Sequence, residues 1–332
     1  MAESKTNDPG GTASAKGKGA SKGAPPELNF RTLLPRDLEI DFVGKRKFFL
    51  ILSTILNLAA IALFFVQGLN YGVDFTGGTA IRLRFTEPTT ATQLRTELGT
   101  LGLRDLTVQD FGEQGREFLL RFEIEEGEEM SSISETLTTL LRDNRGGNQS
   151  FEILSIDSVG PKVGANLRQQ GFLAVLFATI FMGIYITFRF EPSFGLGAVV
   201  ALIHDVFITV GALMLTRQSF DLTTLAALLT VIGFSVHDTI IVSDRVRENL
   251  RRNPKAPLEG VINRSINETL SRTLLTTGTA LFVLFALYFL GGKGLEPFAL
   301  TLLVGFITGT YSSIYIAAPV VLFWSSRSRL AS

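Results

Sequence analysis

Two adjacent pairs of histidine and aspartate lie inside strongly apolar stretches of this sequence. The chain has two histidines, His204 in "VALIHDVFITV" and His237 in "GFSVHDTIIVSDRVREN", and each is followed by an aspartate. An ionisable group deep in a membrane costs about 2.5–3.5 kcal/mol even on insertion scales, so it is expected to face a partner, water or the bundle interior. Asp205 and Asp238 are therefore the first candidates for proton-binding groups.

Counting residues along the predicted helices places Arg272 at a depth similar to that of Asp238. Asp238 lies 16 residues after Leu222, about 24 Å along a helix. Arg272 lies 18 residues before Leu290, about 27 Å along the next, antiparallel helix. A nearby arginine lowers the pKa of a carboxylate, whereas burial raises it. A carboxylate balanced between the two effects could bind and release a proton as water access changes. Ser235, three residues before Asp238, adds a hydroxyl to this relay. The alternative interpretation is that Asp238 and Arg272 form a static buried ion pair.

The histidines admit three interpretations. We expect His204 and His237 to be neutral side chains that hydrogen-bond across helices, with tuning of the neighbouring aspartates as a second role. Two His-Asp pairs could also supply four metal ligands. However, the chain has no other histidine and no cysteine, and adjacent residues on a helix point about 100° apart. We therefore predict no metal site and no cofactor.

The elements that must position these groups are membrane-spanning helices. The chain of 332 residues is 46% hydrophobic with zero formal net charge, and its apolar residues are concentrated in six runs. Each run has roughly 17–25 residues, enough to cross a hydrocarbon core. Burial in a soluble domain is disfavoured, because six such runs seldom occur in one globular domain. The predicted spans are Phe48–Val66, Phe172–Phe188, Gly195–Leu215, Leu222–Val242, Thr273–Leu290 and Phe298–Trp324.

Basic residues near the span ends predict the orientation. Residues 45–47 precede the first span, six basic residues lie between positions 245 and 264, and Arg327 and Arg329 follow the last span. The only basic residues in the short loops of the opposite side are Arg217 and Lys293. Because cytoplasmic loops are enriched in lysine and arginine, we expect both termini to be cytoplasmic.

This topology divides the chain into four parts. Residues 1–27 are rich in Gly, Ser, Ala and Lys and are predicted to be a disordered cytoplasmic tail. Residues 28–70 hold a juxtamembrane segment and the first span, and residues 71–170 form an external domain. Residues 171–332 hold the other five spans, with a cytoplasmic loop at 244–272.

The external domain has the pattern of a β-α-β-β-α-β unit, the ferredoxin-like plan. Its amphipathic second helix carries apolar residues at positions 133, 137, 140 and 141. The two middle strands are expected to meet near Glu113–Gly115. We therefore predict an α-helical polytopic membrane protein with an α+β domain between spans one and two. The predicted strands are 78–85, 105–112, 116–125 and 150–160, and the predicted helices are 90–98 and 131–144.

Glycine-bearing connectors flank this domain. Asp74, Gly77 and Gly78 belong to "YGVDFTGGTAI", and Gly160 and Pro161 belong to "SVGPKVGANL". Glycine permits backbone turns that other residues resist, which favours a hinge or connector role over ligand binding. The segment "GVDFTGG" lacks the Lys-Ser/Thr ending of a phosphate-binding loop.

Span four leaves the membrane through a charged segment. Asp244, Arg245, Arg247 and Glu248 are spaced for i,i+3 and i,i+4 pairs, either as an interface that couples the helices or as a solvated helix end. The following "LEGVINRSINETLSRTLL" is predicted to be an amphipathic helix that runs into span five. In span six, Gly305 and Gly309 have the spacing of a close helix–helix contact.

From about residue 40 onward, these segments resemble the SecF family within the resistance-nodulation-division superfamily. Its motifs occur in the same order here, and the span-four segment is the most specific of them. The matching segments are "GVDFTGGT" (72–79), "VGPKVG" (159–164), "IHDV" (203–206), "GFSVHDTIIVSDRVREN" (233–249), "SRTLLTTGT" (271–279) and "GLEPFALTLLVGFITGTYSSIY" (294–315).

The resemblance implies a non-enzymatic subunit of the bacterial inner membrane that pairs with SecD. Together such subunits use the proton-motive force to help unfolded secreted polypeptide through the SecYEG channel, with a YajC-type accessory subunit and no nucleic acid involved. The family's proton-pathway carboxylate and arginine fall on Asp238 and Arg272, its span-three aspartate falls on Asp205, and SecD supplies a further carboxylate. Many members have Asn where this chain has His237.

Two other functions stay open from the sequence. One is a half-size exporter of small molecules or lipids from the same superfamily, although such exporters usually carry two external domains and twelve spans. The other is a structural subunit that stabilises the channel without moving protons.

Overall fold

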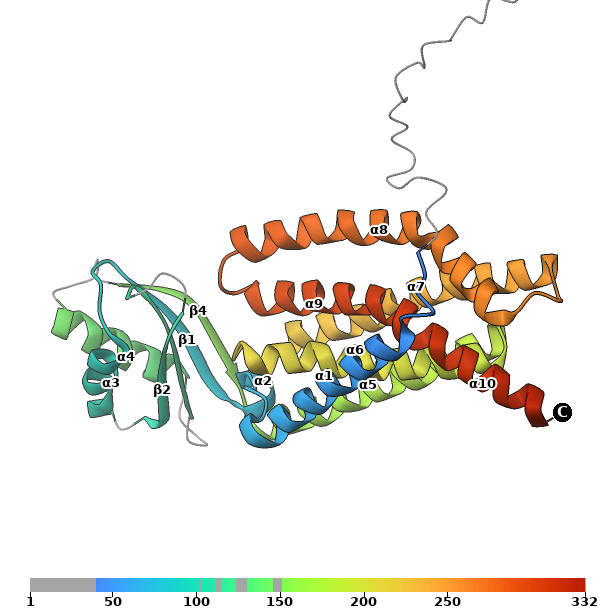
Figure 1. The fold of residues 1–332 in the computed structure, drawn as a ribbon. Coiled ribbons are helices and arrows are strands. Elements are labelled where there is room, and N and C mark those ends of the chain that lie inside the picture. Colours follow the sequence, from blue (N-terminus) through green and yellow to red (C-terminus); the bar gives the residue numbers. More distant parts are fainter. Residues whose placement is uncertain (1–39, 102, 112–114, 124–129, 146–150, 332) are drawn as a thin grey trace, which may run out of the picture.

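The computed structural model describes residues 40–101, 103–111, 115–123, 130–145 and 151–331. The predicted tail at 1–27 and most of the predicted turn at 113–115 lie outside these residues. The described part forms an elongated molecule with a bundle of long helices at one end and a small α/β domain at the other (Figure 1).

In the described part of the chain, six helices are long and apolar enough to cross a membrane, as the sequence predicts. The second, fourth and fifth extend well beyond the predicted apolar runs, and the amphipathic segment after residue 257 is continuous with the fifth. The sixth is interrupted by a short π-helix, η2. The bounds are α1 Arg46–Gln67, α5 Pro161–Arg189, α6 Pro192–Leu215, α7 Leu222–Arg252, α8 Leu258–Leu290, and α9 Glu296–Ser312 followed by η2 Ser313–Ala317 and α10 Ala318–Ala331.

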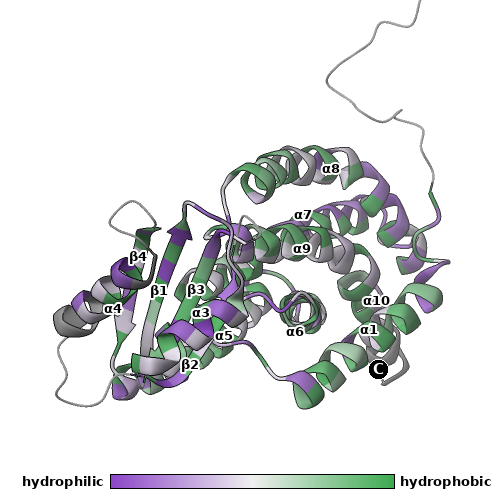
Figure 2. Ribbon diagram, turned by 90° about the vertical axis from the view of Figure 1, so that its left-hand side faces the viewer, coloured by the Kyte–Doolittle hydropathy of each residue, from purple (hydrophilic) through white to green (hydrophobic). Residues whose placement is uncertain are grey.

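The helices divide into an inner and an outer set. About half of the most apolar window is buried in α6 and α7, against 11% in α1 and 17% in α5 and α8. Figure 2, which looks at the molecule from the side of the α/β domain, shows hydrophobic residues on the outward faces of α1 and α8. The inner set, α6, α7 and α9, therefore provides the low-dielectric interior in which polar groups must find partners.

The α/β domain has the predicted β-α-β-β-α-β order of elements. Its antiparallel sheet has the strand order β2-β3-β1-β4, and helices α3 and α4 cover the face that points away from the spans (Figure 1). Ile81, Leu83, Leu94, Leu120 and Leu137 are fully buried between sheet and helices. The bounds are β1 Gly78–Phe85, α3 Ala91–Leu98, η1 Gly99–Leu101, β2 Arg104–Asp110, β3 Glu117–Glu123, α4 Met130–Arg145 and β4 Phe151–Val159.

The opposite face of the sheet contacts the ends of the membrane helices. Arg121 on β3 donates from Nη1 to the Asn70 side chain and to the Tyr71 carbonyl, both at 3.3 Å. Burial lowers the pKa of Arg121, and the nearby charge of Asp221 opposes this effect. The guanidinium of Arg82 lies 4.9 Å from the centre of the Phe111 ring. The Arg82 contact lies within the domain, whereas the two bonds from Arg121 hold the domain against the loop that leaves α1.

The two connectors touch each other through their backbones. Gly77 and Gly78 have φ angles of 80° and 98°, in the left-handed region, directly after the short helix α2 (Val73–Thr76). A Cβ at Gly77 would lie 2.6 Å from Cα of Pro161, and one at Gly164 would lie 2.7 Å from the nitrogen of Gly77. Only glycine permits both this conformation and this close approach.

Asp74 ties the first connector to the start of α7. Its Oδ2 accepts a hydrogen bond of 2.9 Å from the backbone N–H of Leu222, the first residue of that helix. Asp221 caps the same helix by accepting from the N–H of Thr224 at 2.9 Å. Two carboxylates thus satisfy N–H groups that lack partners within the helix and face its positive dipole end.

Replacing Asp74 with alanine is therefore expected to reduce the free energy of unfolding by about 1–2 kcal/mol, the cost of losing a helix cap. Thermal unfolding of the purified chain in detergent measures this loss. Asp110→Ala is the matched control, because Asp110 is an exposed carboxylate at the end of β2. Equal destabilisation by the two changes would contradict the capping role.

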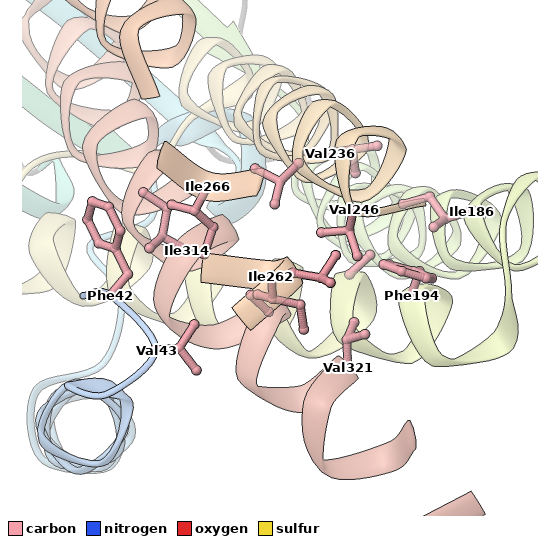
Figure 3. Close-up of a cluster of buried hydrophobic side chains, with 14 of the residues drawn as sticks. Phe42, Val43, Ile186, Phe194, Val236, Val246, Ile262, Ile266, Ile314 and Val321 are labelled. Carbon is pink, nitrogen blue, oxygen red and sulfur yellow. The ribbon is translucent and has the colours of Figure 1, made fainter. Parts of the chain in front are cut away.

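At the other end of the bundle, residues 40–43 form a strap across α8. The side chain of Asn267 pairs with the N–H and C=O of Ile40, and Asn263 accepts from the N–H groups of Phe42 and Val43. Phe42 and Val43 belong to an apolar cluster built largely from α6, α7, α8 and α10 (Figure 3). The strap fixes the position at which the chain enters α1.

Candidate functional site

Asp205 is the centre of a polar cluster where three inner helices meet. Its side chain on α6 is only 1% exposed. Its Oδ2 accepts hydrogen bonds from the hydroxyls of Ser235 on α7, at 2.5 Å, and Ser312 on α9, at 2.7 Å. Its Oδ1 lies 2.9 Å from Nδ1 of His204. The carboxylate is thus fully partnered and links α6, α7 and α9.

The prediction for His204 was wrong in its partner. The imidazole does not bond across helices but folds back onto the next residue of its own helix, so adjacent side chains meet although their Cβ atoms diverge. The ring stacks on Tyr311 with centroids 5.9 Å apart, and Nε2 is buried with no hydrogen-bond partner among the described residues. The Tyr311 hydroxyl bonds Ser53 and the Phe49 carbonyl of α1, at 2.7 and 2.9 Å.

Asp238 occupies a second, less completely bonded position. It is fully buried on α7, and its Oδ2 accepts a hydrogen bond of 3.2 Å from the Thr310 hydroxyl of α9. Thr310 in turn lies 2.8 Å from the hydroxyl of Thr277 on α8. Oδ1 of Asp238 is buried with no partner in the described part of the chain. Asp238 therefore has one oxygen that is free to interact with a proton or a further donor.

Arg272 and His237 form no hydrogen bond or salt bridge with Asp238 among the described residues, although His237, the adjacent residue, interacts electrostatically with that carboxylate. Both side chains are exposed on the bundle surface, and within the described chain neither forms a salt bridge or a side-chain hydrogen bond. An ion pair between Arg272 and Asp238 is thus absent from the described residues, as is a cross-helix hydrogen bond from His237. On α8, Thr277 instead of Arg272 faces the site.

Three site residues on α9 were missed from the sequence. Thr310, Tyr311 and Ser312 form a polar run within an apolar span, and their depth could have identified them. The π-helix η2 begins at Ser313, directly after them. Such bulges are frequent at functional sites because they alter the direction of the side chains that follow.

Small residues bring α7 and α9 close together at this site. A Cβ on Gly305 would overlap both methyl groups of Val231, and one on Gly309 would lie 3.0 Å from Cβ of Ser235. The close contact expected from the Gly305 and Gly309 spacing is therefore present. It places the hydroxyls of α9 within reach of Ser235, Asp205 and Asp238.

The charged end of α7 is bonded mainly to α8. Arg245 pairs with Glu248 at 2.5 Å, at the predicted i,i+3 spacing, and with Glu268 of α8 at 2.6 Å. Arg247 donates to the Arg189 carbonyl of α5 at 3.4 Å, whereas Asp244 is exposed. These residues hold the ends of α5, α7 and α8 together some distance from the buried aspartates.

No group of three or more metal-ligating side chains occurs within the described residues. The site instead contains two buried carboxylates on neighbouring helices, each contacted by hydroxyls of α9. Carboxylates and hydroxyls of this kind can bind, release and pass protons, and buried carboxylates in membrane helices commonly mark ion or proton pathways.

Comparison with known proteins identifies the family of this chain. Residues 139–327 match the family model described as "Protein export membrane protein SecD/SecF, C-terminal", and residues 62–89 match the "SecD/SecF GG Motif". A protein translocase subunit SecF from Calditerrivibrio nitroreducens is 42% identical over 90% of this chain and 99% of its own length. The chain belongs to the SecF family. The corresponding SecF subunit of Desulfurispirillum indicum is 44% identical over 87% of this chain and 92% of its own.

Solved structures of SecDF have the same fold as this SecF-family chain. The SecDF crystal structure from Thermus thermophilus has a TM-score of 0.79 and 35% identity over 89% of this chain. SecDF in its super-membrane-facing form has a TM-score of 0.65 at 36% identity, also over 89% of the chain. In both comparisons this chain spans 40% of the longer SecDF chain.

Proposed function

We propose that this chain is a subunit of a proton-driven complex that assists export of proteins through the Sec channel. The observation that carries the proposal is the pair of buried carboxylates, Asp205 and Asp238, in a bundle with the SecF fold. Both contact hydroxyl groups of α9, and Asp238 has one oxygen without a partner in the described chain. Family membership supports the Sec pathway as the process that the protons drive.

In this proposal Asp238 carries the proton, and Asp205 is a second polar centre that transmits the change to α6 and α9. Ser235 donates to Asp205 and lies one turn from Asp238. Protonation of Asp238 would therefore change the electrostatic surroundings of Ser235 and, through it, of Asp205. His204 and His237 have tuning roles. Arg272 acts at the surface of the bundle, where it meets Asp238 only after α8 moves or through groups of a partner.

The partner that we propose is SecD. A charged or polar side chain exposed to lipid is costly, so the exposed Arg272 and His237 favour a surface that another chain covers. This chain spans 40% of the solved SecDF chain, and the remainder of that chain shows that a fold of this kind can be joined to a larger assembly. SecYEG, a YajC-type subunit and unfolded secreted polypeptide complete the proposed assembly.

We also propose that the α/β domain lies on the outer side of a bacterial inner membrane and that both chain ends are cytoplasmic. The basic residues around positions 45–47 and 245–264 support this orientation. The strand order β2-β3-β1-β4, together with two helices on one face, supports a ferredoxin-like domain. In that position the domain can contact polypeptide that emerges from the channel.

The decisive experiment co-purifies this chain with its partner and reconstitutes the complex into vesicles with an imposed pH gradient. We expect a second six-span chain to co-purify, and proton flux measured with an internal pH-sensitive dye to rise above that of empty vesicles. A purely structural subunit would support export without this flux. A stable and active monomer without a partner chain would contradict the hetero-complex.

A further inference from the structure

An apolar groove opens on the side of the bundle between α1 and α5. Its volume is about 350 Å³, within the range of small-molecule sites in proteins. Helices α6 and α7 form its floor through Val210 and Leu228, and α1 and α5 form its walls through Phe64 and Val175. Because α1 and α5 are largely exposed, the groove faces the hydrocarbon region of a membrane.

The end of the groove nearest the α/β domain is closed by aromatic side chains. Phe75 of α2 stacks on Phe220, the residue just before the Asp221 cap of α7, with ring centroids 5.5 Å apart. Tyr71 lies against both rings at 6.2 and 6.3 Å. Tyr71 and Phe75 belong to the first connector and Phe220 belongs to the loop between α6 and α7, so an occupant of the groove would touch the junction between the α/β domain and the spans.

A positive charge lies at this closed end. Arg168 of α5 lines the groove, and its guanidinium is 5.8 Å from the centre of the Tyr71 ring. It lies four residues before Phe172, the first residue of the predicted apolar run. Arginine and tyrosine are typical of this boundary between hydrocarbon and headgroups. The exposed Arg168 forms no salt bridge with any described carboxylate.

We propose that this groove binds an anionic phospholipid, with one acyl chain inside it and the phosphate held by Arg168. The guanidinium is planar and matches two phosphate oxygens, and its charge complements an anionic headgroup. A flexible acyl chain suits an apolar groove of about 350 Å³ better than a partner helix, which is about 10–12 Å across. The lipid joins α1, α5 and the aromatic connector cluster.

The test uses the full chain in its complex, stripped of lipid in detergent and then supplied with dioleoylphosphatidylglycerol or dioleoylphosphatidylcholine. Native mass spectrometry counts bound lipid, and thermal unfolding measures stabilisation by ligand. We expect phosphatidylglycerol to be retained and to raise the Tm more than phosphatidylcholine. Arg168→Gln should weaken phosphatidylglycerol binding about tenfold or more, because a charge-assisted bond is lost.

Two further variants separate the groove from general surface charge. Lys162→Gln removes the same charge from an exposed position on α5 that does not line the groove, and it should bind like the unaltered chain. Val210→Phe fills the groove and should abolish retention. Because Arg168 is exposed, Arg168→Gln tests the proposal even where Val210→Phe impairs folding.

Three results would overturn the proposal. If Lys162→Gln loses as much phosphatidylglycerol binding as Arg168→Gln, the lipid is attracted by general surface charge and not by the groove. Unchanged binding in Arg168→Gln or in a folded Val210→Phe variant would place the lipid elsewhere. Phosphatidylglycerol that stabilises the isolated chain but not the complex would show that a partner helix covers the groove.

Discussion

Replacing Asp238 with asparagine is expected to reduce proton-driven export to the level of vesicles without the complex, while the complex still assembles. Asparagine keeps the size of the side chain, and its carbonyl can still accept the hydrogen bond from Thr310. It cannot bind and release a proton. Export of a secreted substrate into vesicles, with co-purification of the partner measured in parallel, separates this loss from a failure of folding.

Asp244→Asn is the matched control for this change. It removes the same charge from the same helix at an exposed position beyond the buried site, and it should keep export near the unaltered level. Loss of assembly in Asp238→Asn, or equal loss of export in both variants, would contradict the role of Asp238 as the proton carrier.

Arg272 offers a sharper distinction between a proton relay and a static ion pair. A static pair predicts that Asp238→Asn combined with Arg272→Gln restores activity, because no unpaired charge remains. A relay predicts that the double variant assembles and stays inactive. The exposed position of Arg272, apart from Asp238, already disfavours a permanent pair. An active double variant would end the relay hypothesis.

The helices, strands and depths could be predicted from the sequence because each follows from a local pattern. The alternation of "GTAIRLRF" gives β1 with the observed bounds Gly78–Phe85, since only its inward residues pack against α3 and α4. The six spans follow from length and hydropathy. The depth of Asp205 and Asp238 in the membrane follows from their place within these spans.

The rotation of each span about its axis could not be predicted. A lipid-facing side and a bundle-facing side are both apolar in a membrane, so hydrophobic periodicity does not distinguish them. Arg272 and Thr277 are five residues apart and therefore point about 140° from each other on α8. Depth alone suggested Arg272 as the neighbour of Asp238, whereas rotation places Thr277 toward Thr310.

Side-chain rotamers and helix contacts explain the other differences. The bond between His204 and Asp205 depends on how the imidazole turns on its own helix, which residue spacing does not determine. Ser312 reaches Asp205 only because α9 packs so closely on α7 and α6. Glycine spacing in α9 indicated a close contact, but the partner helix became evident only in three dimensions.

A methyl group on Gly305 is expected to destabilise the bundle by about 1–3 kcal/mol, the usual cost of overpacking. The added Cβ of Gly305→Ala would overlap both methyl groups of Val231, and α7 and α9 would have to separate. Separation lengthens the bonds from Ser235 and Ser312 to Asp205 and from Thr310 to Asp238. The midpoint of thermal unfolding in detergent and proton-driven export should therefore fall together.

A second substitution tests whether this contact between α7 and α9 is the cause. Val231→Ala removes the overlapping methyl groups, so Gly305→Ala combined with Val231→Ala should regain most of the stability and export lost in Gly305→Ala. Gly278→Ala is the control, because a Cβ at Gly278 of α8 would meet open space. Alanine exceeds glycine in helix propensity by about 1 kcal/mol, so the control should be neutral or slightly stabilising. If the double variant stays as unstable as Gly305→Ala, or the control loses as much, the close packing of α7 on α9 is not what holds the two aspartates in place.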